Sequence, residues 1–226
     1  MKLSNKILLG FIGIVLIYIL LVAIEIRFRG MHDRLADSSL NIKSVLLGNY
    51  KTLIIKDLDL DVAMLSSDTS KIEIRSRKEE PNENIQYHTS GDTLLIDSNG
   101  SFIENGVSIK IYIPKSTKRI VSSATKVELF DFSCDAISIT QSGGRCNILD
   151  GTKFDFLSIK GIKSSNFSIV SPAIKSLEVD LNDSGLSIRE KTDSVKAVLK
   201  NSANLNLSGF NYLNLEKEND CKVLIR

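Results

Sequence analysis

The feature that most constrains the fold is a pattern of apolar-x-apolar pairs that returns about every twenty residues from Val127 onward. The pairs form two alternating sets. The first set keeps this step throughout and comprises Val127/Leu129, Cys146/Ile148, Phe167/Ile169, Leu186/Ile188 and Leu205/Leu207. The second set has the same step and begins with Ile137/Ile139, Leu157/Ile159 and Leu177/Val179. It continues less regularly around 195–199 and at Leu213/Leu215. A constant period that holds two short strands predicts a repeat architecture.

Small polar residues lie between the two sets. They form turns readily, because Gly and Asn accept left-handed backbone angles and Ser, Asp and Asn hydrogen-bond their own backbone. These turns are Ser142-Gly143-Gly144, Ser164-Ser165-Asn166, Asp183-Ser184-Gly185 and Ser202-Ala203-Asn204. Coils of this kind stack with their strands about 4.8 Å apart. The sequence therefore predicts an all-β fold, a parallel β-helix (β-solenoid) with about 20 residues per coil. An antiparallel sandwich also has short, evenly spaced strands, but it does not account for a repeated turn or for a period set by a pair of strands.

The region before Val127 is less regular but also has the pattern of strands. The segment 51–64 alternates as one strand, with Leu58, Leu60 and Val62 on one face and Asp57, Asp59 and Asp61 on the other. Further strands are predicted in KIEIRSR, NIQYH, DTLLIDS and VSIKIYIP, with a turn at Gly91. Pro114 ends the last of them, because proline cannot donate to a strand ladder. We expect these strands to begin the solenoid or to cap its lower end.

The first thirty residues indicate a membrane anchor. Residues 7–24 contain no charge, and 18 residues are about the minimum that spans a bilayer core of ~30 Å. A cleaved signal peptide needs a small-x-small site after the apolar run, and none is evident. A lipoprotein needs a cysteine there, whereas the first cysteine is Cys134. A buried core helix is disfavoured because no other segment supplies a helical partner. We therefore expect one retained N-terminal transmembrane helix, a signal-anchor.

This anchor defines three segments and a location. Residues 1–29 form the transmembrane anchor with its flanks, 30–44 a juxtamembrane linker, and 45–226 the β-solenoid. Lys2 and Lys6 precede the apolar run, and Arg27, Arg29 and Arg34 follow it, so the charges alone do not fix the orientation. The short tail most simply stays in the cytoplasm. We expect a single-pass protein of the bacterial inner membrane with a periplasmic C-terminal domain.

The order SIKIYIP…KRIVSSATKVELFDF…AISITQSGGRCNILD resembles the auto-transporter adhesin head GIN domain family, found mainly in the envelopes of Bacteroidetes-type bacteria. The resemblance covers roughly 49–224. It rests on the IYIP strand, the following small-residue turn and the repeated coils. The family often has Ser-Gly-Ala-Gly where this chain has Ser122-Ser123-Ala124-Thr125, and its members are often secreted or lipid-attached. The resemblance implies a β-helix with an adhesin-like role and supplies no catalytic residues.

The residues with reactive side chains do not form a recognisable active site. His32 lies in the linker, and His88 is expected at an exposed strand end, although Ser90 and Asp92 are near in sequence. A triad needs a defined spatial arrangement rather than proximity in sequence. The two histidines and three cysteines show no zinc spacing. We therefore predict no catalytic residues, no cofactor and no metal.

Acidic residues supply two weaker candidates. The row Asp57/Asp59/Asp61 has the oxygen ligands of a cation site but lacks the glycine and the terminal glutamate of a calcium loop. An acidic group of the kind found in polysaccharide-cleaving β-helices is approached only by Asp180, Asp183, Arg189 and Glu190. This group does not recur on adjacent coils. A polysaccharide-active enzyme is therefore the least favoured function.

The repeat period predicts how far apart the cysteines lie. Cys146 occupies an inward position beside Phe167 and Leu186, where cysteine acts as a small apolar residue. Cys221 is about four coils further on, or roughly 19 Å at ~4.8 Å per coil, and a disulfide needs Cα atoms within about 7 Å. These two cysteines should not pair within the chain. A bond between Cys134 and Cys146 is left open.

The overall charge excludes one class of partner. The formal net charge is +2, from 29 basic and 27 acidic residues, and nucleic-acid binding needs a basic excess. We expect a cell-envelope β-solenoid that acts as a non-catalytic binding or scaffold module, adhesin-like, with envelope proteins or surface glycans as partners. The alternative is a β-helical structural polymer of the bactofilin type, formed by self-association of exposed strand edges.

Overall fold

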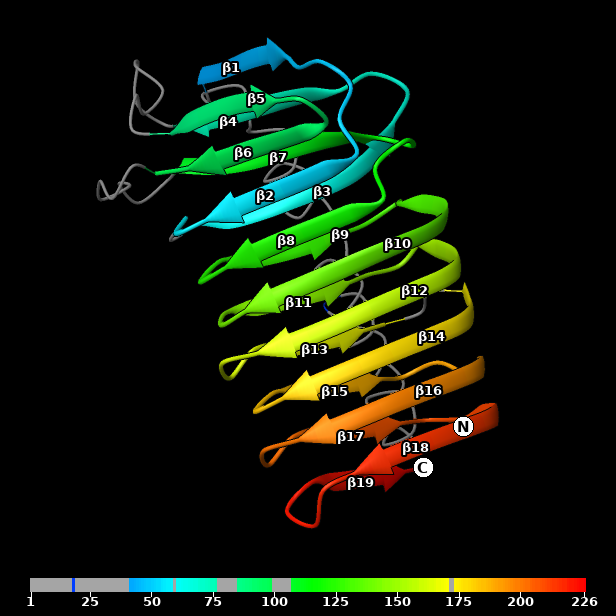
Figure 1. The fold of residues 1–226 in the computed structure, drawn as a ribbon. Helices are drawn as coiled ribbons and strands as arrows, with labels where there is room; N and C mark the ends of the chain where they lie inside the picture. Colours follow the sequence, from blue (N-terminus) through cyan, green and yellow to red (C-terminus); the bar gives the residue numbers. More distant parts are fainter. Residues whose placement is uncertain (1–17, 19–40, 59, 77–84, 99–106, 171–172) are drawn as a thin grey trace, which may run out of the picture. The chain divides into compact units, whose positions relative to one another are not determined.

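The two sets of apolar pairs form the facing inner surfaces of two β-sheets in the computed structural model of the chain (Figure 1). The structure describes residues 18, 41–58, 60–76, 85–98, 107–170 and 173–226. The solenoid body runs from Asn41 to Arg226. Its strands form one ten-stranded and one nine-stranded sheet. The prediction of a parallel β-solenoid is confirmed, because register partners on neighbouring strands lie one coil apart in the chain, a period of about 20 residues.

Each regular coil contributes a short strand to the ten-stranded sheet. These strands are β9 (Lys126–Leu129), β11 (Arg145–Ile148), β13 (Asn166–Ile169), β15 (Gly185–Ile188), β17 (Asn204–Leu207) and β19 (Lys222–Ile225). They pair in parallel with no shift in register, so Cys146, Phe167, Leu186 and Leu205 lie directly beside one another. Their side chains, like those of the second apolar residue in each of these four strands, are buried. Continuous inward rows of this kind stabilise a stack in which each coil contacts only its neighbours.

Each regular coil also contributes a strand to the nine-stranded sheet. These strands are β8 (Arg119–Ser123), β10 (Ser133–Ser142), β12 (Lys153–Ile162), β14 (Ala173–Asn182), β16 (Thr192–Lys200) and β18 (Phe210–Lys217). The long ones bend near their beginnings. In β12, Asp155 and Phe156 are both exposed between the buried Phe154 and Leu157, so the inward alternation changes phase there. Figure 1 shows the resulting curve at the start of each long strand. We call this bend the corner.

The first coils are not stacked in chain order. β2 (Thr52–Lys56) and β3 (Asp61–Ser67) pair with β8 and β9 on one side. On their other side they pair with β6 (Thr93–Asp97) and β7 (Val107–Pro114). Three antiparallel strands then complete the sheets at this end: β1 (Asn41–Leu46), β4 (Lys71–Ser76) and β5 (Gln86–Ser90). The upstream strands therefore both begin the solenoid and cap one end of it, as the sequence predicts.

The expectation of one strand over 51–64 is wrong. β2 ends at Lys56, Asp57 adopts a φ of 49°, and β3 begins at Asp61 in the other sheet. The segment is thus a strand, a turn and a second strand, like every later coil. The alternation of Leu58 and Val62, both buried, continues through this turn and conceals it in the sequence.

Most turns from a long strand to the following short strand contain a left-handed residue. Ala124, Gly143, Ser164, Asp183 and Ser202 all have φ between 49° and 70°. Directly after these turns lies a row of small, mostly buried residues, which we call the turn row. Its members are Thr125, Gly144, Ser165, Ser184, Ala203 and Cys221, each preceding a short strand.

The predicted anchor at 7–24 lies outside the described residues except for Tyr18, and so does most of the predicted linker 30–44. Strand β1 begins at Asn41, ahead of the predicted start of the solenoid at 45. Within the residues that the structure describes, there is no helix with the length and apolar character needed to cross a membrane.

Candidate functional site

The residues that resemble a triad in sequence are not assembled into one. His88 lies on β5, whose residues are all exposed, as the sequence predicts. The carboxylate of Asp92 is 2.7 Å from the ammonium of Lys51 rather than beside the imidazole. Ser90 faces Thr93 across the hairpin. His32 lies outside the described residues. These side chains form a strand end and an ion pair, with no relay between a nucleophile and a base.

The acidic candidates are likewise dispersed. Asp57 is in a turn, Asp61 forms an ion pair with Lys126 at 2.7 Å, and Asp59 lies outside the described residues. Asp180 pairs with Lys160 at 3.3 Å, and Asp183 accepts a hydrogen bond from Ser164 at 3.0 Å. Arg189 and Glu190 follow the far end of β15 and are exposed. In the described part of the chain, no three His, Cys, Asp or Glu side chains gather as they would around a metal ion.

The three cysteines are free. Cys146 is fully buried in the inward row, and burial raises the pKa of its thiol to about 12. Cys134 is half-buried at the corner, and burial raises its pKa to about 11, opposed by the nearby charge of Lys118. Cys146 and Cys221 are separated by the four strand steps from β11 to β19, as predicted from the period. Because a thiolate is the reactive form, Cys134 and Cys146 are poor nucleophiles.

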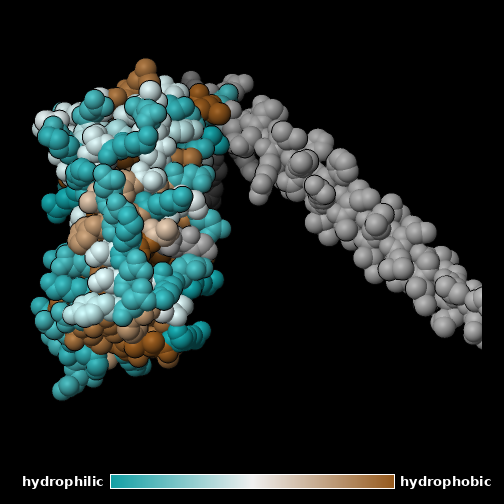
Figure 2. Space-filling view, turned by 90° about the vertical axis from the view of Figure 1, so that its right-hand side faces the viewer, coloured by the Kyte–Doolittle hydropathy of each residue, from teal (hydrophilic) through white to brown (hydrophobic). Residues whose placement is uncertain are grey.

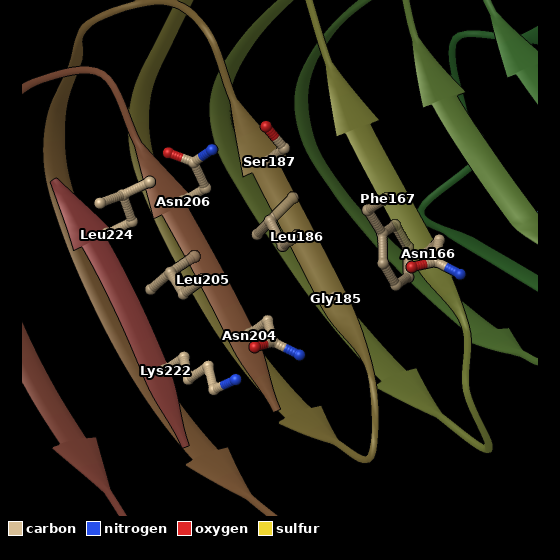
Figure 3. A pocket seen from close by; sticks show the side chains of 10 residues that line it. All are labelled: Asn166, Phe167, Gly185, Leu186, Ser187, Asn204, Leu205, Asn206, Lys222 and Leu224. Atoms are coloured by element: carbon tan, nitrogen blue, oxygen red, sulfur yellow. The ribbon is translucent and has the colours of Figure 1, made fainter. Parts of the chain in front are cut away.

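A hollow with a volume of about 390 Å³ lies on the outer face of the ten-stranded sheet (Figure 3). It crosses four parallel strands, β13, β15, β17 and β19. The first residues of these strands form one outward row: Asn166, Gly185, Asn204 and Lys222. The third residues form the next outward row: Ser168, Ser187, Asn206 and Leu224. The hollow is therefore built from strand register, which fixes the spacing of its side chains.

Gly185 leaves a gap in the first outward row, because it has no side chain. It has no left-handed φ, so the turn does not require glycine there, unlike Gly143 and Gly144. A Cβ atom at this position would lie 3.1 Å from the amide oxygen of Asn166, which leans over the gap. Glycine within a strand loses packing and marks a place where another group approaches closely. The missing side chain thus opens the row between Asn166 and Asn204.

The polar groups in the hollow are amides, a hydroxyl and one ammonium. The side-chain nitrogens of Asn166 and Asn204 donate to the carbonyl oxygens of Ser164 and Ser202, at 3.5 and 3.2 Å, which orients both amides. Ser187, Asn206 and Lys222 form no side-chain hydrogen bond or ion pair with the described residues. The described lining contains no carboxylate, imidazole or thiol. This arrangement can donate and accept hydrogen bonds, but it has no base beside the Ser187 hydroxyl to activate it.

Sequence reasoning missed this site because it interpreted Asn166, Gly185 and Asn204 as turn residues. In the structure each is the first residue of a short strand, and only the residues before it form the turn. The signal that could have located the row is the even spacing of these three positions, which lie one coil apart at each step and one place before the apolar pairs.

Comparison with known proteins supports the fold and leaves the family open. No protein-family model matches the chain, and no curated protein matches it. Solved structures with the same fold include two described as a “putative adhesin”. The one from Bacteroides fragilis is 11% identical with a TM-score of 0.59, and the match covers 83% of this chain and 97% of that one. The one from Parabacteroides merdae is 13% identical with a TM-score of 0.55, covering 83% and 96%.

A third neighbour has a different description. It is a “putative lipid binding protein” from Parabacteroides distasonis, 11% identical with a TM-score of 0.55, and the match covers 82% of this chain and 94% of that chain. At such identities the likeness concerns the β-solenoid fold alone. It agrees with the fold that the GIN domain resemblance implies.

Proposed function

We propose that the chain is a membrane-anchored β-solenoid of the bacterial cell envelope that acts as a non-catalytic, adhesin-like binding module related to the GIN domain family. The observation that carries this proposal is the hollow on the outer face of the ten-stranded sheet, where amide and hydroxyl groups stand beside the apolar side chains of Phe167, Leu186, Leu205 and Leu224. Parallel strands fix the spacing of the backbone positions in both rows, and hydrogen bonds orient the amides of Asn166 and Asn204 before a partner arrives. Such preorganisation reduces the entropy lost on binding.

A binding role also agrees with the neighbours of the same fold, which are described by binding or adhesion rather than by catalysis. The reactive side chains that the sequence offers are dispersed or engaged in ion pairs. The partners are envelope proteins or surface glycans, whose polar groups complement Ser187, Asn206 and Lys222. The apolar segment 7–24 holds the solenoid at the inner membrane, on its periplasmic side.

The hollow can be tested by filling it. Gly185→Asn supplies the side chain that the row lacks, and the amide of Asn166 needs to shift by only a few tenths of an ångström to admit the new Cβ atom. Ser158→Asn is the matched control, because Ser158 is an outward residue of β12 in the other sheet. Each tagged full-length variant is purified from envelope membranes, and co-purifying molecules are quantified by mass spectrometry and carbohydrate analysis. We expect Gly185→Asn, but not Ser158→Asn, to lose a specific partner. Equal partner profiles for wild type and Gly185→Asn contradict the proposal.

The location has its own test. Protease is added to intact cells and to spheroplasts that contain the full-length protein. Digestion of the solenoid only after the outer barrier is breached supports the periplasmic location. Protection in both preparations contradicts it and favours the structural-polymer alternative, for which sedimentation of the full chain at rising concentration gives a direct test.

A further inference from the structure

A second outward row lies at the corner, where the long strands begin. Phe156, Ser176, Ser194 and Tyr212 occupy successive positions of it in direct register. We call it the corner row. Figure 2 faces the side of the solenoid on which the long strands begin, and apolar and near-neutral side chains lie there among hydrophilic ones, with an apolar patch towards the lower end. The corner row is distinct from the hollow, which lies on the other sheet.

Two aromatic rings are exposed in this row. Phe156 is 38% exposed and Tyr212 is 62% exposed. The core does not need them, because the inward positions beside the corner are filled by the buried Phe154 and Ile174. Between the two rings lie three strand steps, or about 14 Å at ~4.8 Å per step. An occupant that contacts both rings must therefore be extended along the solenoid axis.

The space between the rings is polar. Ser176 and Ser194 stand there, and neither forms a side-chain hydrogen bond with the described residues. Each ring is thus isolated, and the row forms no continuous apolar patch of the kind that marks a protein interface. A surface on which two rings flank a pair of hydroxyl groups instead complements molecules that carry both an apolar face and many hydroxyl groups.

Hydrogen-bonding groups of balanced charge lie next to the corner row. Lys175 is 2.6 Å from Asp155, and Asn211 donates to Asp193 at 3.1 Å. Lys175, Asp155 and Asp193 border a hollow of about 450 Å³. Its charged lining consists of three lysines and three aspartates: Lys153, Lys175, Lys191, Asp135, Asp155 and Asp193. The equal numbers of positive and negative groups favour a neutral occupant over an acidic one.

We propose that the corner row is a binding site for a linear, neutral glycan that lies along the solenoid axis. The C–H faces of two separated sugar rings pack on Phe156 and Tyr212, because an aromatic ring supplies a large apolar surface. The sugar hydroxyls between them hydrogen-bond with Ser176 and Ser194. The inference rests on the proposed binding function and adds to it a ligand class and a second site.

The test uses the full-length chain in a sugar-free detergent and the neutral hexasaccharides cellohexaose, chitohexaose and maltohexaose as probes. Affinities are measured by isothermal titration calorimetry. We expect saturable binding of at least one probe. Phe156→Ala and Tyr212→Ala should each weaken that binding by about tenfold, as loss of a stacked aromatic contact does elsewhere, whereas Tyr212→Phe should retain it. Tyr87→Ala, an exposed ring on β5, is the matched control and should bind like wild type.

A fluorescence readout gives independent support. The chain contains no tryptophan, so Tyr212→Trp places a single reporter in the corner row. We expect its emission to change as the bound hexasaccharide is added and to remain unchanged with hexagalacturonate, which is acidic.

Three results would overturn the inference. The first is that none of the three hexasaccharides binds. The second is that binding is the same in wild type, Phe156→Ala and Tyr212→Ala. The third is that these variants lose an envelope protein instead of a sugar, which makes the row a protein interface. A further combination separates the two proposals. If the wild-type chain binds an envelope partner, Gly185→Asn loses that partner, and the wild type binds no hexasaccharide, then this inference is contradicted and the proposed function is intact.

Discussion

Ser165 donates a hydrogen bond to Ser184 across 3.1 Å, one coil further along the turn row, and both residues are buried. Ser184 in turn donates to the carbonyl oxygen of Asn182 at 2.9 Å. The two hydroxyls thus form a short chain that satisfies each donor. The next member of the row is Ala203, which shows that a methyl group also fits this position.

The first prediction concerns this chain of hydroxyls. Ser184→Ala removes the acceptor of Ser165 and leaves a buried donor unpaired, so we expect a loss of about 1–2 kcal/mol in the free energy of unfolding. The double variant Ser165→Ala/Ser184→Ala should lose less than the sum of the two single variants, because no orphaned hydroxyl remains. Urea unfolding of the four proteins measures this. Strict additivity would show that the hydroxyls are not coupled.

The second prediction concerns the inward rows. Leu157 is fully buried between the sheets, and Leu157→Ala should lower the free energy of unfolding by about 2–5 kcal/mol through lost burial and a residual cavity. Leu224 is 48% exposed on the outer face, so Leu224→Ala should change stability by no more than about 0.5 kcal/mol. Thermal and urea unfolding of the two variants provide the comparison. Similar losses at both sites would contradict the assigned faces.

The third prediction separates the cost of a left-handed backbone conformation from the cost of a steric clash with a neighbouring backbone. Gly91 and Gly144 both have positive φ, at 55° and 71°. A Cβ atom at Gly91 meets nothing within 4 Å, whereas one at Gly144 would lie 2.5 Å from the carbonyl oxygen of Thr125. Gly91→Ala should therefore cost about 1–2 kcal/mol from the left-handed conformation alone. Gly144→Ala should cost about 1–3 kcal/mol more, because backbone must move. If the two variants unfold at the same urea concentration, the turns are not packed as described.

The fourth prediction concerns thiol reactivity. In a Cys134→Ser/Cys221→Ser variant, Cys146 is the remaining thiol. Its burial and its pKa of about 12 keep the thiolate population very small at neutral pH. We expect no reaction with a disulfide reagent such as DTNB in the native protein and one thiol per chain in urea. Rapid labelling without denaturant would show that the inward row opens.

The fifth prediction follows from a carboxylate near the capped end. Glu73 is buried, and its oxygens lie 2.7 Å from Lys71 and 3.1 Å from Arg75. Burial alone raises the pKa of this carboxyl group, but the hydrogen bonds from the two cations outweigh it and hold the pKa below its ordinary value of 4.5. The folded state therefore binds the proton more weakly than the unfolded state does. The resulting stabilisation is present above pH 4.5 and is lost as the pH falls through the folded pKa.

Glu73→Gln measures this contribution. At pH 7 the variant should be less stable than wild type, and the difference in free energy of unfolding should shrink as the pH is lowered below 4.5. Glu128→Gln serves as a control on the same outer face, because Glu128 is more exposed than Glu73. A difference that stays constant between neutral and strongly acidic pH would show that the pKa of Glu73 is not depressed.

Much of the fold can be predicted because every coil must place apolar side chains at the same inward positions as the coils next to it. The inward pairs such as Phe167/Ile169 and Leu186/Ile188 repeat with the period, and the strands have a side-chain period of two. The corner cannot be predicted in this way, because Asp155 and Phe156 are consecutive exposed residues and shift the phase of the alternation. The beginnings of the long strands, and with them the row from Phe156 to Tyr212, are therefore not visible from the apolar pairs.

The order of the first coils is not readable from the sequence either. β6 and β7 have the same pattern as other strands, and nothing local shows that they stack on β2 and β3 from the far side. The hollow is missed for a similar reason, since whether Gly185 belongs to a turn or a strand depends on register with Asn166 and Asn204. Such pairings are set by contacts between coils rather than by local preference.

The detour between β3 and β8 also affects how the chain acquires this fold. Thr52 lies opposite Arg119, which follows it by more than three coil lengths of chain, whereas Arg119 lies opposite Ser138, a single coil length later. Closing the longer loop costs only about 1 kcal/mol more in chain entropy. The difference in timing is larger, since β2 and β3 leave the ribosome before β6 and β7, their first partners in the chain, which follow about two coil lengths later. Later coils can add as they emerge from the ribosome. The four strands that carry the hollow therefore assemble through contacts of short sequence separation, onto first coils whose contacts have a long sequence separation.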